Sequence, residues 1–484
     1  MSAETLVIVS VMLPLLGSVG TFVAPRGARW IGLAAAVLLA PVSFRLARVV
    51  FDSGGVVHEL GGWTTPLGIH LQVDGLSALL LLAVAVVGLA VSVYSHGYFG
   101  GAGEKAGFFW PLWMFLIAGL NAMFVSGDVF NIYVTLELIG LAAASLVALA
   151  GRPVALRSAL RYLFVSLTGS LLYLLGVALL YGAYGVLDLT LLASRVELQP
   201  HSVVALVLIT GGLMMKTALF PMHFWLPPAH SSAPAPVSAA LSALVIKGGF
   251  YALVRIWFGV FGDLIGAPAA QAIGILGAAA ILWGSVQALC QSRVKLVVAY
   301  STVAQVGYLF LAFPLAVEAA DPGRVWTAMI MLLLSHATAK SAMFLAAGNV
   351  QRLVGHDDMD ALRRITRRMP LTAFAIGAAG VSLVGLPPTA GFMGKWLLIG
   401  AALDQGQWWW VVVLLGGSLL AAAYMVRVLA PAFVSAGDEV PRETTSRRLE
   451  WTALALALLS ILLGFYATVP ARLLDGVLAA GGLT

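Results

Sequence analysis

The chain has 484 residues, of which 61% are hydrophobic and only 10% are charged, and its mean hydropathy is +0.98. An average soluble protein carries about 25% charged residues, so this composition excludes a chain of ordinary soluble domains. The formal net charge is +6, from 27 Lys and Arg against 21 Asp and Glu. In a membrane protein such an excess indicates which loops face the cytoplasm, not a nucleic-acid partner.

Apolar stretches long enough to cross a bilayer recur along the whole chain. Only helices and closed barrels satisfy the backbone inside lipid, and stretches of this length without strict alternation are helices. We therefore predict an all-α polytopic membrane protein in which residues 1–484 form a single membrane domain. Because a span needs about 20 apolar residues, we expect about 14 transmembrane helices, at about 5–24, 29–50, 72–94, 108–125, 128–150, 160–184, 202–224, 236–258, 268–290, 295–315, 325–349, 370–403, 408–433 and 451–469.

Basic residues are distributed unevenly between alternate loops. The odd-numbered loops and their helix ends hold most of them, and the other side holds only Arg45, Arg48, Arg195, Arg255, Arg324 and Arg472. Cytoplasmic loops carry the excess of Lys and Arg, so the odd-numbered loops are predicted to be cytoplasmic. With 14 spans, both termini are then expected on the outer side of the cell inner membrane.

Five ionisable side chains lie well inside the predicted spans: Glu137, Lys216, Lys247, Lys340 and Lys395. Each such charge costs about 2.5–3.5 kcal/mol at the centre of a helix. One lysine of this kind can be explained by snorkelling or by a static ion pair, but one glutamate cannot neutralise four ammonium groups. Either the surplus lysines are often neutral or water reaches them. Buried lysine gives up its proton readily and arginine does not, which favours proton carriers.

The depth of these residues also favours a relay. At 1.5 Å per residue, Glu137 and three of the lysines lie about 12 to 22 Å along their spans, in the middle part of a core about 30 Å thick. A row of titratable groups at one depth is more typical of a lateral path than of a single substrate cage. The sequence leaves open whether their helices are neighbours.

Two predicted spans are interrupted by proline. Pro221 follows Lys216 in the seventh span, and Pro387 and Pro388 precede Lys395 in the twelfth. Proline within a helix removes a backbone hydrogen bond, and broken helices at membrane depth are tolerated where they line a cavity. Two broken helices five spans apart, each with a lysine near its break, indicate internal repeats with ion sites at the breaks.

Five strings together resemble the antiporter-like membrane subunits shared by respiratory complex I, Mrp-type cation/proton antiporters and membrane-bound hydrogenases. The resemblance extends over residues 100–400, and the second string is long enough to be highly specific. The strings are GDVFNIYVTLEL at 127–138, KTALFPMHFWLPPAHSSAPAPVSAALSALVIKGGFYALVR at 216–255, KLVVAYSTVAQVGY at 295–308, HATAKSAMFLAAG at 336–348 and GLPPTAGFMGKW at 385–396.

The resemblance implies a fold of 14 helices, in which helices 4–8 and 9–13 form two inverted five-helix repeats with discontinuous helices 7 and 12. The chain would divide into N-terminal helices 1–3 at 1–100, a first repeat at 101–260, a second repeat at 261–435 and a C-terminal helix 14 at 436–484.

The resemblance also implies roles for the buried charges. In such subunits a glutamate of helix 5 pairs with a lysine of helix 7, and protons move through a lysine of helix 8 towards a lysine or glutamate of helix 12. The residues at these motif positions are Glu137, Lys216, Lys247 and Lys395, and the family's HAxxK segment on the central path is matched by His336 and Lys340. Residues 293–296 depart from the pattern, because they read Arg-Val-Lys-Leu where relatives often have Asp-x-Lys-Arg.

No cofactor or metal is expected. Cys290 is the only cysteine, which excludes an iron–sulfur cluster. His223 and His230 flank one kink, whereas a b-type haem needs two histidines facing each other; they are expected to line a water path or to make an interfacial hydrogen bond. Asp74 and Asp128 precede helices, where capping is expected. The acidic run at 357–360 precedes a cluster of arginines and is expected to be a solvated cytoplasmic segment.

The expected function is proton translocation by one subunit of a multi-subunit membrane complex. A Na⁺/H⁺ antiporter of the Mrp type, with this chain as its D-type subunit, is favoured. Its partners would be other membrane subunits, including homologous antiporter-like ones, together with protons and Na⁺ or K⁺. The alternatives are a proton-pumping subunit of a redox-driven complex (NADH-quinone oxidoreductase or membrane-bound hydrogenase), a stand-alone secondary transporter, a redox subunit and a passive scaffold.

Overall fold

The structure is a computed structural model that describes residues 1–484 except 66, 101–103, 364, 435–445 and 480–484. The side chains of residues 104–106, 263 and 478–479 are likewise not described. Within this part of the chain, 12 helices are long and apolar enough to cross a membrane. Two shorter apolar helices, α8 and α17, lie in the two spans that were predicted to be interrupted.

The first half of the chain contains eight helices and a hairpin before the first break. They are α1 (Ala3–Val23), α2 (Ala28–Ser53), β1 (Val56–Glu59), β2 (His70–Val73), α3 (Gly75–Tyr98), α4 (Glu104–Phe124), α5 (Val129–Ala148), α6 (Pro153–Tyr184), α7 (Leu189–Arg195) and α8 (Pro200–Lys216). After the break follow α9 (Leu226–Ser232), α10 (Ala235–Ala240), a π-helical segment (Leu241–Val245), α11 (Ile246–Val254) and a second π-helical segment (Arg255–Val260).

The second half has the same alternation of long and broken helices. Its helices are α12 (Ala267–Cys290), α13 (Val294–Phe310), α14 (Ala312–Val317), α15 (Pro322–Val354), α16 (Ile365–Arg368), α17 (Pro370–Val384), α18 (Ala390–Asp404), α19 (Trp408–Leu429), α20 (Arg447–Leu462) and α21 (Thr468–Ala479).

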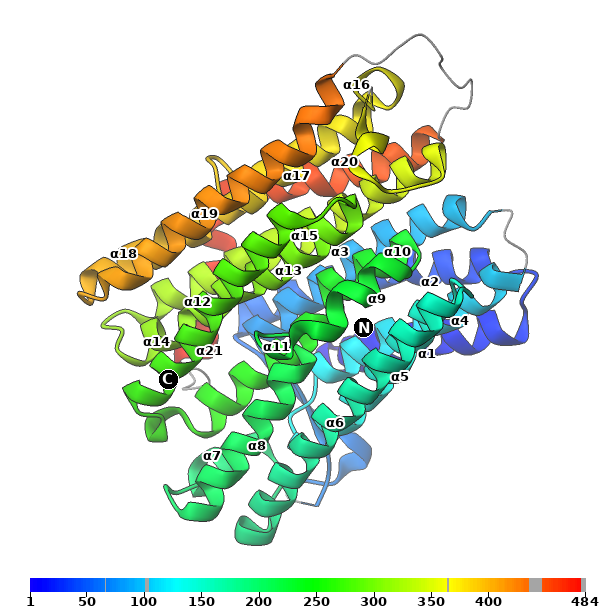
Figure 1. Cartoon of the computed structure of the whole chain (residues 1–484). Coiled ribbons are helices and arrows are strands. Elements are labelled where there is room, and N and C mark those ends of the chain that lie inside the picture. Colours follow the sequence, from blue (N-terminus) through cyan, green and yellow to red (C-terminus); the bar gives the residue numbers. More distant parts are fainter. Residues whose placement is uncertain (66, 101–103, 364, 435–445, 480–484) are drawn as a thin grey trace.

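The most deeply buried helices are those that carry the central lysines. The 18-residue cores of α15 and of the segment Ala235–Val260 are 100% buried, against 33% for α1. Figure 1 shows α13 and α15 in the middle of the bundle, with α5, α6 and α8 on one flank and α17, α19 and α20 on the other. A helix that is apolar all round and enclosed by other helices has no lipid-facing side, so a polar group on α15 faces only protein.

Both predicted breaks are confirmed. α8 ends at Lys216, and Ala218, with a φ of 54°, turns the chain before α9 begins. α17 ends before Gly385, whose φ is 86°, and α18 begins after Thr389, whose hydroxyl accepts from the backbone N–H of Phe392 at 3.2 Å. The breaks therefore leave the ends of two helices inside the bundle.

The hairpin, α7 and α21 lie outside the predicted spans, and the hairpin is not part of the all-α prediction. Four-residue strands, with Val56 paired to Val73, are too short to produce a clear alternation of apolar and polar residues. The expected caps are confirmed: Asp74 accepts from the backbone N–H of Ser77 at 3.0 Å, and Asp128 accepts from that of Asn131 at 2.7 Å.

One buried ion pair fastens the hairpin to α7. Nδ1 of His70 lies 2.6 Å from Oδ2 of Asp188, and both side chains are less than 10% exposed. The hydrogen bond to Asp188 raises the pKa of His70, against the effect of burial. Burial favours the neutral acid at Asp188, but the hydrogen bonds from His70 and from the backbone N–H of Leu191 outweigh it and lower the pKa of Asp188.

The stabilisation from this pair should depend on pH. The contribution of His70 is complete below its ordinary pKa of about 6.5 and is lost as the pH rises through its raised value, whereas that of Asp188 is lost as the pH falls through its lowered value. His70→Gln should therefore cost about 1.5–3 kcal/mol near pH 6 and less near pH 9. Tm values of the purified protein at the two pH values test this; equal losses would refute it.

Candidate functional site

Two nitrogen bases meet in the buried centre of the bundle. Nζ of Lys247, on α11, lies 2.5 Å from Nδ1 of His336, on α15, and also donates to the carbonyl oxygen of Ser242 at 2.5 Å. Both side chains are buried. An ammonium group and an imidazolium ion both lack an acceptor, so this contact is compatible with at most one of the two groups being charged.

Lys340 joins the same network through α13. It donates to the hydroxyl of Ser301 and to the carbonyl oxygen of Val298 at 3.0 Å. The hydroxyl of Thr302 donates to that same carbonyl at 3.0 Å and lies 3.0 Å from the hydroxyl of Ser242. Since the carbonyl of Ser242 accepts from Lys247, a continuous series of polar contacts connects Lys340, Lys247 and His336. We call these three residues the central cluster.

The central cluster is held without a countercharge. Among the ion pairs between described residues, none includes Lys247, His336 or Lys340. Their partners are hydroxyls, carbonyls and each other. Burying several cations without carboxylates is prohibitively costly, so the cluster holds fewer protons than it has basic sites. A vacant basic site beside a protonated one is the arrangement that proton transfer requires.

Lys216 and Glu137 are close but are not bonded, which corrects the expected ion pair. Lys216 donates to the hydroxyl of Ser166 at 2.7 Å and to the carbonyl oxygen of Leu136 at 3.3 Å. Glu137 still interacts electrostatically with Lys216, and its Oε1 is buried with no hydrogen-bond partner among the described residues. Lys216 is the last residue of α8, and from there its side chain reaches α6 and the backbone of α5.

Lys395 lies across the second break. From α18 it donates to the carbonyl oxygens of Leu383 and Val384, at 3.3 and 2.9 Å, and to the hydroxyl of Ser418 at 3.0 Å. Its Nζ is also 4.2 Å from the centre of the Tyr308 ring. The last carbonyls of a helix have no partner within the helix and favour cations, so the break at α17 creates the site that holds Lys395.

α13 spans the distance between Lys395 and the central cluster. The side-chain amide of Gln305 donates to the carbonyl oxygen of Leu383 at 2.9 Å, which also accepts from Lys395. Gln305 is four residues after Ser301 and so lies on the same face of α13. Sequence reasoning included Gln305 in a family string but did not single it out, because its partner is contributed by a helix 78 residues away.

The two histidines near the first break have different surroundings. His230 is fully buried and stacks on Phe344 with ring centres 4.5 Å apart, and both its ring nitrogens lack hydrogen-bond partners among the described residues. Its ring interacts electrostatically with Lys340 and Lys247, which places it beside the central cluster. His223 stacks on Phe220 with ring centres 5.6 Å apart. The predicted site residues therefore form a central group and two flanking lysines.

The family can be assigned from comparisons with known proteins. The family model described as "NADH:quinone oxidoreductase/Mrp antiporter, TM" matches residues 126–421, more than half of the chain, and a model described as "NADH-Ubiquinone oxidoreductase (complex I), chain 5 N-terminus" matches residues 63–109. The chain belongs to the complex I/Mrp antiporter membrane-subunit family.

Two curated relatives show how the family divides. The N subunit of NADH-quinone oxidoreductase from Desulforudis audaxviator is 38% identical over 83% of this chain and 80% of that protein. The D-type subunit of a Na⁺/H⁺ antiporter from Bacillus subtilis is 30% identical over 95% of this chain and 93% of that protein.

The similar solved structures likewise come from different kinds of complex. A chain of the Mrp complex from Dietzia sp. superposes with a TM-score of 0.89 at 26% identity, covering 99% of this chain and 97% of that one. A chain of an archaeal membrane-bound sulfane sulfur reductase gives 0.88 at 28% identity, covering 98% and 96%. A chain of respiratory complex I from Thermus thermophilus gives 0.75 at 26% identity, covering 97% and 98%. All three are multi-subunit membrane complexes, and this chain is a multi-pass membrane protein of their fold.

A fifth buried lysine of this antiporter-like protein was missed. Lys295 is 1% exposed, and its Nζ donates to the carbonyl oxygen of Ala233 at 2.5 Å. Sequence reasoning had counted it among the cytoplasmic loops and helix ends, because it is the first residue of the predicted span 295–315 and closely follows Arg293. Asp357, expected in a solvated segment, is also buried, at 3% exposed. The burial of Lys295 and of Asp357 cannot be read from the local sequence, because it depends on packing between distant loops.

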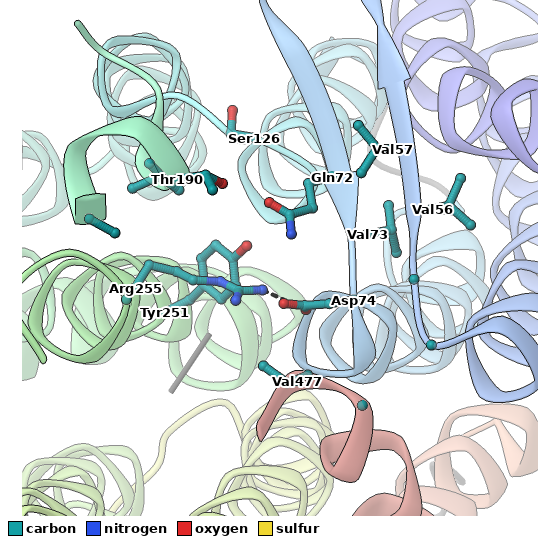
Figure 2. Close-up of a pocket in the computed structure, with 16 residues that line it drawn as sticks. Val56, Val57, Gln72, Val73, Asp74, Ser126, Thr190, Tyr251, Arg255 and Val477 are labelled. Atoms are coloured by element: carbon teal, nitrogen blue, oxygen red, sulfur yellow. Dashed lines mark hydrogen bonds and ion pairs between the residues drawn. The ribbon is translucent and has the colours of Figure 1, made fainter. Parts of the chain in front are cut away.

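A pocket of about 420 Å³, lined in part by polar side chains, lies at the C-terminal end of α11, near Arg255. The hairpin, α7 and the start of α3 line it, and Figure 2 shows the Arg255 side chain passing over Tyr251 to reach Asp74. The distance from Nη2 of Arg255 to Oδ1 of Asp74 is 2.5 Å, and Arg255 also donates to the hydroxyl of Ser77 at 3.1 Å. Sequence reasoning had placed Arg255 at the outer end of the predicted span 236–258, without a partner.

This ion pair should be important for stability. Arg255→Met leaves the buried carboxylate of Asp74 uncompensated, and removing one partner of a buried pair costs about 3–5 kcal/mol. Combining it with Asp74→Asn removes the orphaned charge and should recover most of the loss. The Tm of the two purified variants measures this. A double variant as unstable as Arg255→Met would show that the charge of Asp74 is not the cause.

Proposed function

We propose that this chain is the proton-translocating subunit of a multi-subunit cation/proton antiporter of the Mrp type. The antiporter relative from Bacillus subtilis aligns over nearly the whole length of both chains. The Mrp-complex chain also superposes better than the complex I chain, with a TM-score of 0.89 against 0.75. The observation that carries the transport function is the set of buried bases Lys247, His336 and Lys340, which is held by hydroxyls and carbonyls and has no ion pair among the described residues.

In the proposed mechanism the relay step starts from protonated Lys216, whose charge Glu137 stabilises. The two groups are separated here, with Lys216 turned to a hydroxyl and a carbonyl. Two charges 4 Å apart interact by about 4 kcal/mol at an effective dielectric constant of 20, so separation makes proton release easier. The proton then moves through the central cluster and along α13 to Lys395, which delivers it to the other side of the membrane.

The architecture proposed with this function has 14 spans, with the broken α8 and the broken pair α17 and α18 as helices 7 and 12. Helices 4–8 and 9–13 are its inverted repeats. The odd-numbered loops face the cytoplasm of an inner-membrane protein, and both termini face outwards, because most of the basic residues lie in those loops. The proposed partners are homologous antiporter-like subunits and other small membrane subunits, and the exchanged cation is Na⁺ or K⁺.

The second candidate is a proton-pumping subunit of a redox-driven complex. It is favoured by the 38% identity to an N subunit of NADH-quinone oxidoreductase and by the TM-score of 0.88 with the sulfane sulfur reductase. The relay is the same in both candidates, and only the source of energy differs. Purifying the native complex separates them, because homologous antiporter-like subunits alone indicate the antiporter, and iron–sulfur proteins indicate the redox complex.

The relay is tested by Glu137→Ala, Lys216→Ala and Lys216→Arg. Each should lower cation-driven proton transport in inside-out vesicles by about a hundredfold or more, because transfer by a positioned group is worth roughly 10²–10⁴ in rate. Lys216→Arg belongs to the series because arginine keeps the charge but does not release the proton.

The matched control is Glu59→Ala, which removes an exposed carboxylate from the hairpin and should leave transport unchanged. Copurification of the partner subunits shows whether the complex assembles. Wild-type transport in an assembled Lys216→Ala complex would rule out the proposed relay.

A further inference from the structure

We propose that Asp357 and Lys295 form the cytoplasmic end of the proton path and that His230 connects them to the central cluster. The inference rests on the proposed function and on its orientation of the odd-numbered loops. None of these three residues is part of the path from Lys216 to Lys395 described above. They provide the cluster with a direct connection to the loop side of the bundle.

Asp357 is held over the start of α13 by backbone contacts. Its carbonyl oxygen accepts from the backbone N–H of Val294 at 2.7 Å, and the backbone N–H of Met359 donates to the carbonyl of Ser292 at 2.9 Å. The two oxygens of its carboxylate differ in their hydrogen bonding. Oδ1 accepts two hydrogen bonds from Arg293, at 3.0 and 2.8 Å, whereas Oδ2 is buried without a hydrogen-bond partner among the described residues. Oδ2 is therefore a buried acceptor without a donor among the described residues.

Lys295 is the second residue of α13, in the segment whose start Asp357 contacts through its backbone. The charged groups acting on it are Asp357, Arg293 and Arg152, all from odd-numbered loops. Arg293, two residues earlier, has a side chain that is 36% exposed. In the proposed orientation Lys295 is therefore a buried base near the cytoplasmic side.

His230 interacts electrostatically with Lys295 and with two lysines of the central cluster. Lys295 donates to the carbonyl of Ala233, three residues after His230 on the same turn. The charges acting on the His230 ring are, in decreasing order, those of Lys295, Lys340 and Lys247. An imidazole with two unbonded nitrogens can accept a proton on one and release it from the other, which a proton path needs at this point.

A purely structural role explains less of this arrangement. Lys295 does cap the end of α9 through Ala233, as basic side chains often do at helix ends. Capping requires neither the unbonded Oδ2 of Asp357 nor the two unbonded nitrogens of His230. These buried, unsatisfied atoms lie on either side of Lys295, and each costs stability unless it is used.

The transfer balances in protons and charge. Oδ2 of Asp357 takes a proton from cytoplasmic water and passes it to neutral Lys295, which restores the carboxylate. The ammonium group of Lys295 then protonates His230, which releases the proton from its other nitrogen to a vacant base of the central cluster. Asp357 and Lys295 return to their starting states, His230 is left in its other tautomer until its ring turns over, and the reverse sequence releases protons to the cytoplasm.

The test uses Asp357→Asn and Lys295→Arg in the intact complex in inside-out vesicles. Asp357→Asn keeps the volume of the side chain and the backbone contacts of the loop. The complex should therefore assemble with this variant even if the bulkier side chain in Lys295→Arg prevents assembly. Both variants should lower cation-driven proton transport by about tenfold or more. The half-maximal pH on the cytoplasmic side should shift, and the dependence on the outer pH should stay the same. Asp357→Glu should restore transport.

Asp360→Asn is the matched control. It removes a carboxylate of the same loop that is 77% exposed and pairs with Arg363, and it should leave the rate unchanged. Rates of Asp357→Asn within twofold of wild type would overturn the inference, as would an equal loss at every cytoplasmic pH or an equal loss in Asp360→Asn. Lys216→Ala distinguishes the two proposals: if it too transports normally, the proposed function fails, and if it alone is inactive, only the cytoplasmic connection fails.

Discussion

The structure depends on the contact between Lys247 and His336, whose nitrogens are 2.5 Å apart in the most enclosed part of the bundle. Two positive charges at that distance would repel by about 7 kcal/mol even at an effective dielectric constant of 20. The contact is therefore compatible with at most one charge. In the proposed mechanism a proton that arrives at one nitrogen displaces the charge from the other, so that the contact acts as a point of transfer.

The broken helices position the lysines that flank this contact. Lys216 is the last residue of α8, and Lys395 donates to the last carbonyls of α17. An unbroken helix would satisfy those carbonyls internally, and Lys395 would lose two of its partners. Pro221, Pro387 and Pro388 thus act through the backbone groups that the breaks leave free. The two breaks are not equivalent, because Lys216 finds its partners on α5 and α6 and not across its own break.

Much of the fold follows from local properties of the sequence. Long apolar runs define the helices, and proline within a run predicts both breaks. The buried charges are visible because lysine is rare inside lipid. The missing parts depend on contacts between distant segments. Lys295 reads as a loop residue because only the packing of α9 encloses it, and the separation of Glu137 from Lys216 depends on the competing hydroxyl of Ser166, which lies on a different helix.

The two ends of the path carry different basic residues, and the difference fixes its direction through the protein. At the end that is proposed to be cytoplasmic the buried base is Lys295, and a lysine can release a proton. At the opposite end of α11 it is Arg255, bonded to Asp74 and Ser77. Arginine stays charged in proteins, and a fixed cation is an electrostatic barrier to protons.

The polar pocket in Figure 2 is therefore separated from Lys247 by a permanent positive charge. Arg255 lies two helical turns beyond Lys247 on the same face. In the proposed mechanism a proton on the central cluster consequently has no direct exit along α11. Apart from the proposed connection through His230 and Lys295, the polar route from the cluster leads sideways along α13, past Ser301 and Gln305, to the carbonyl of Leu383 and to Lys395. The lateral direction of the relay thus follows from the choice of arginine at one position and lysine at the others.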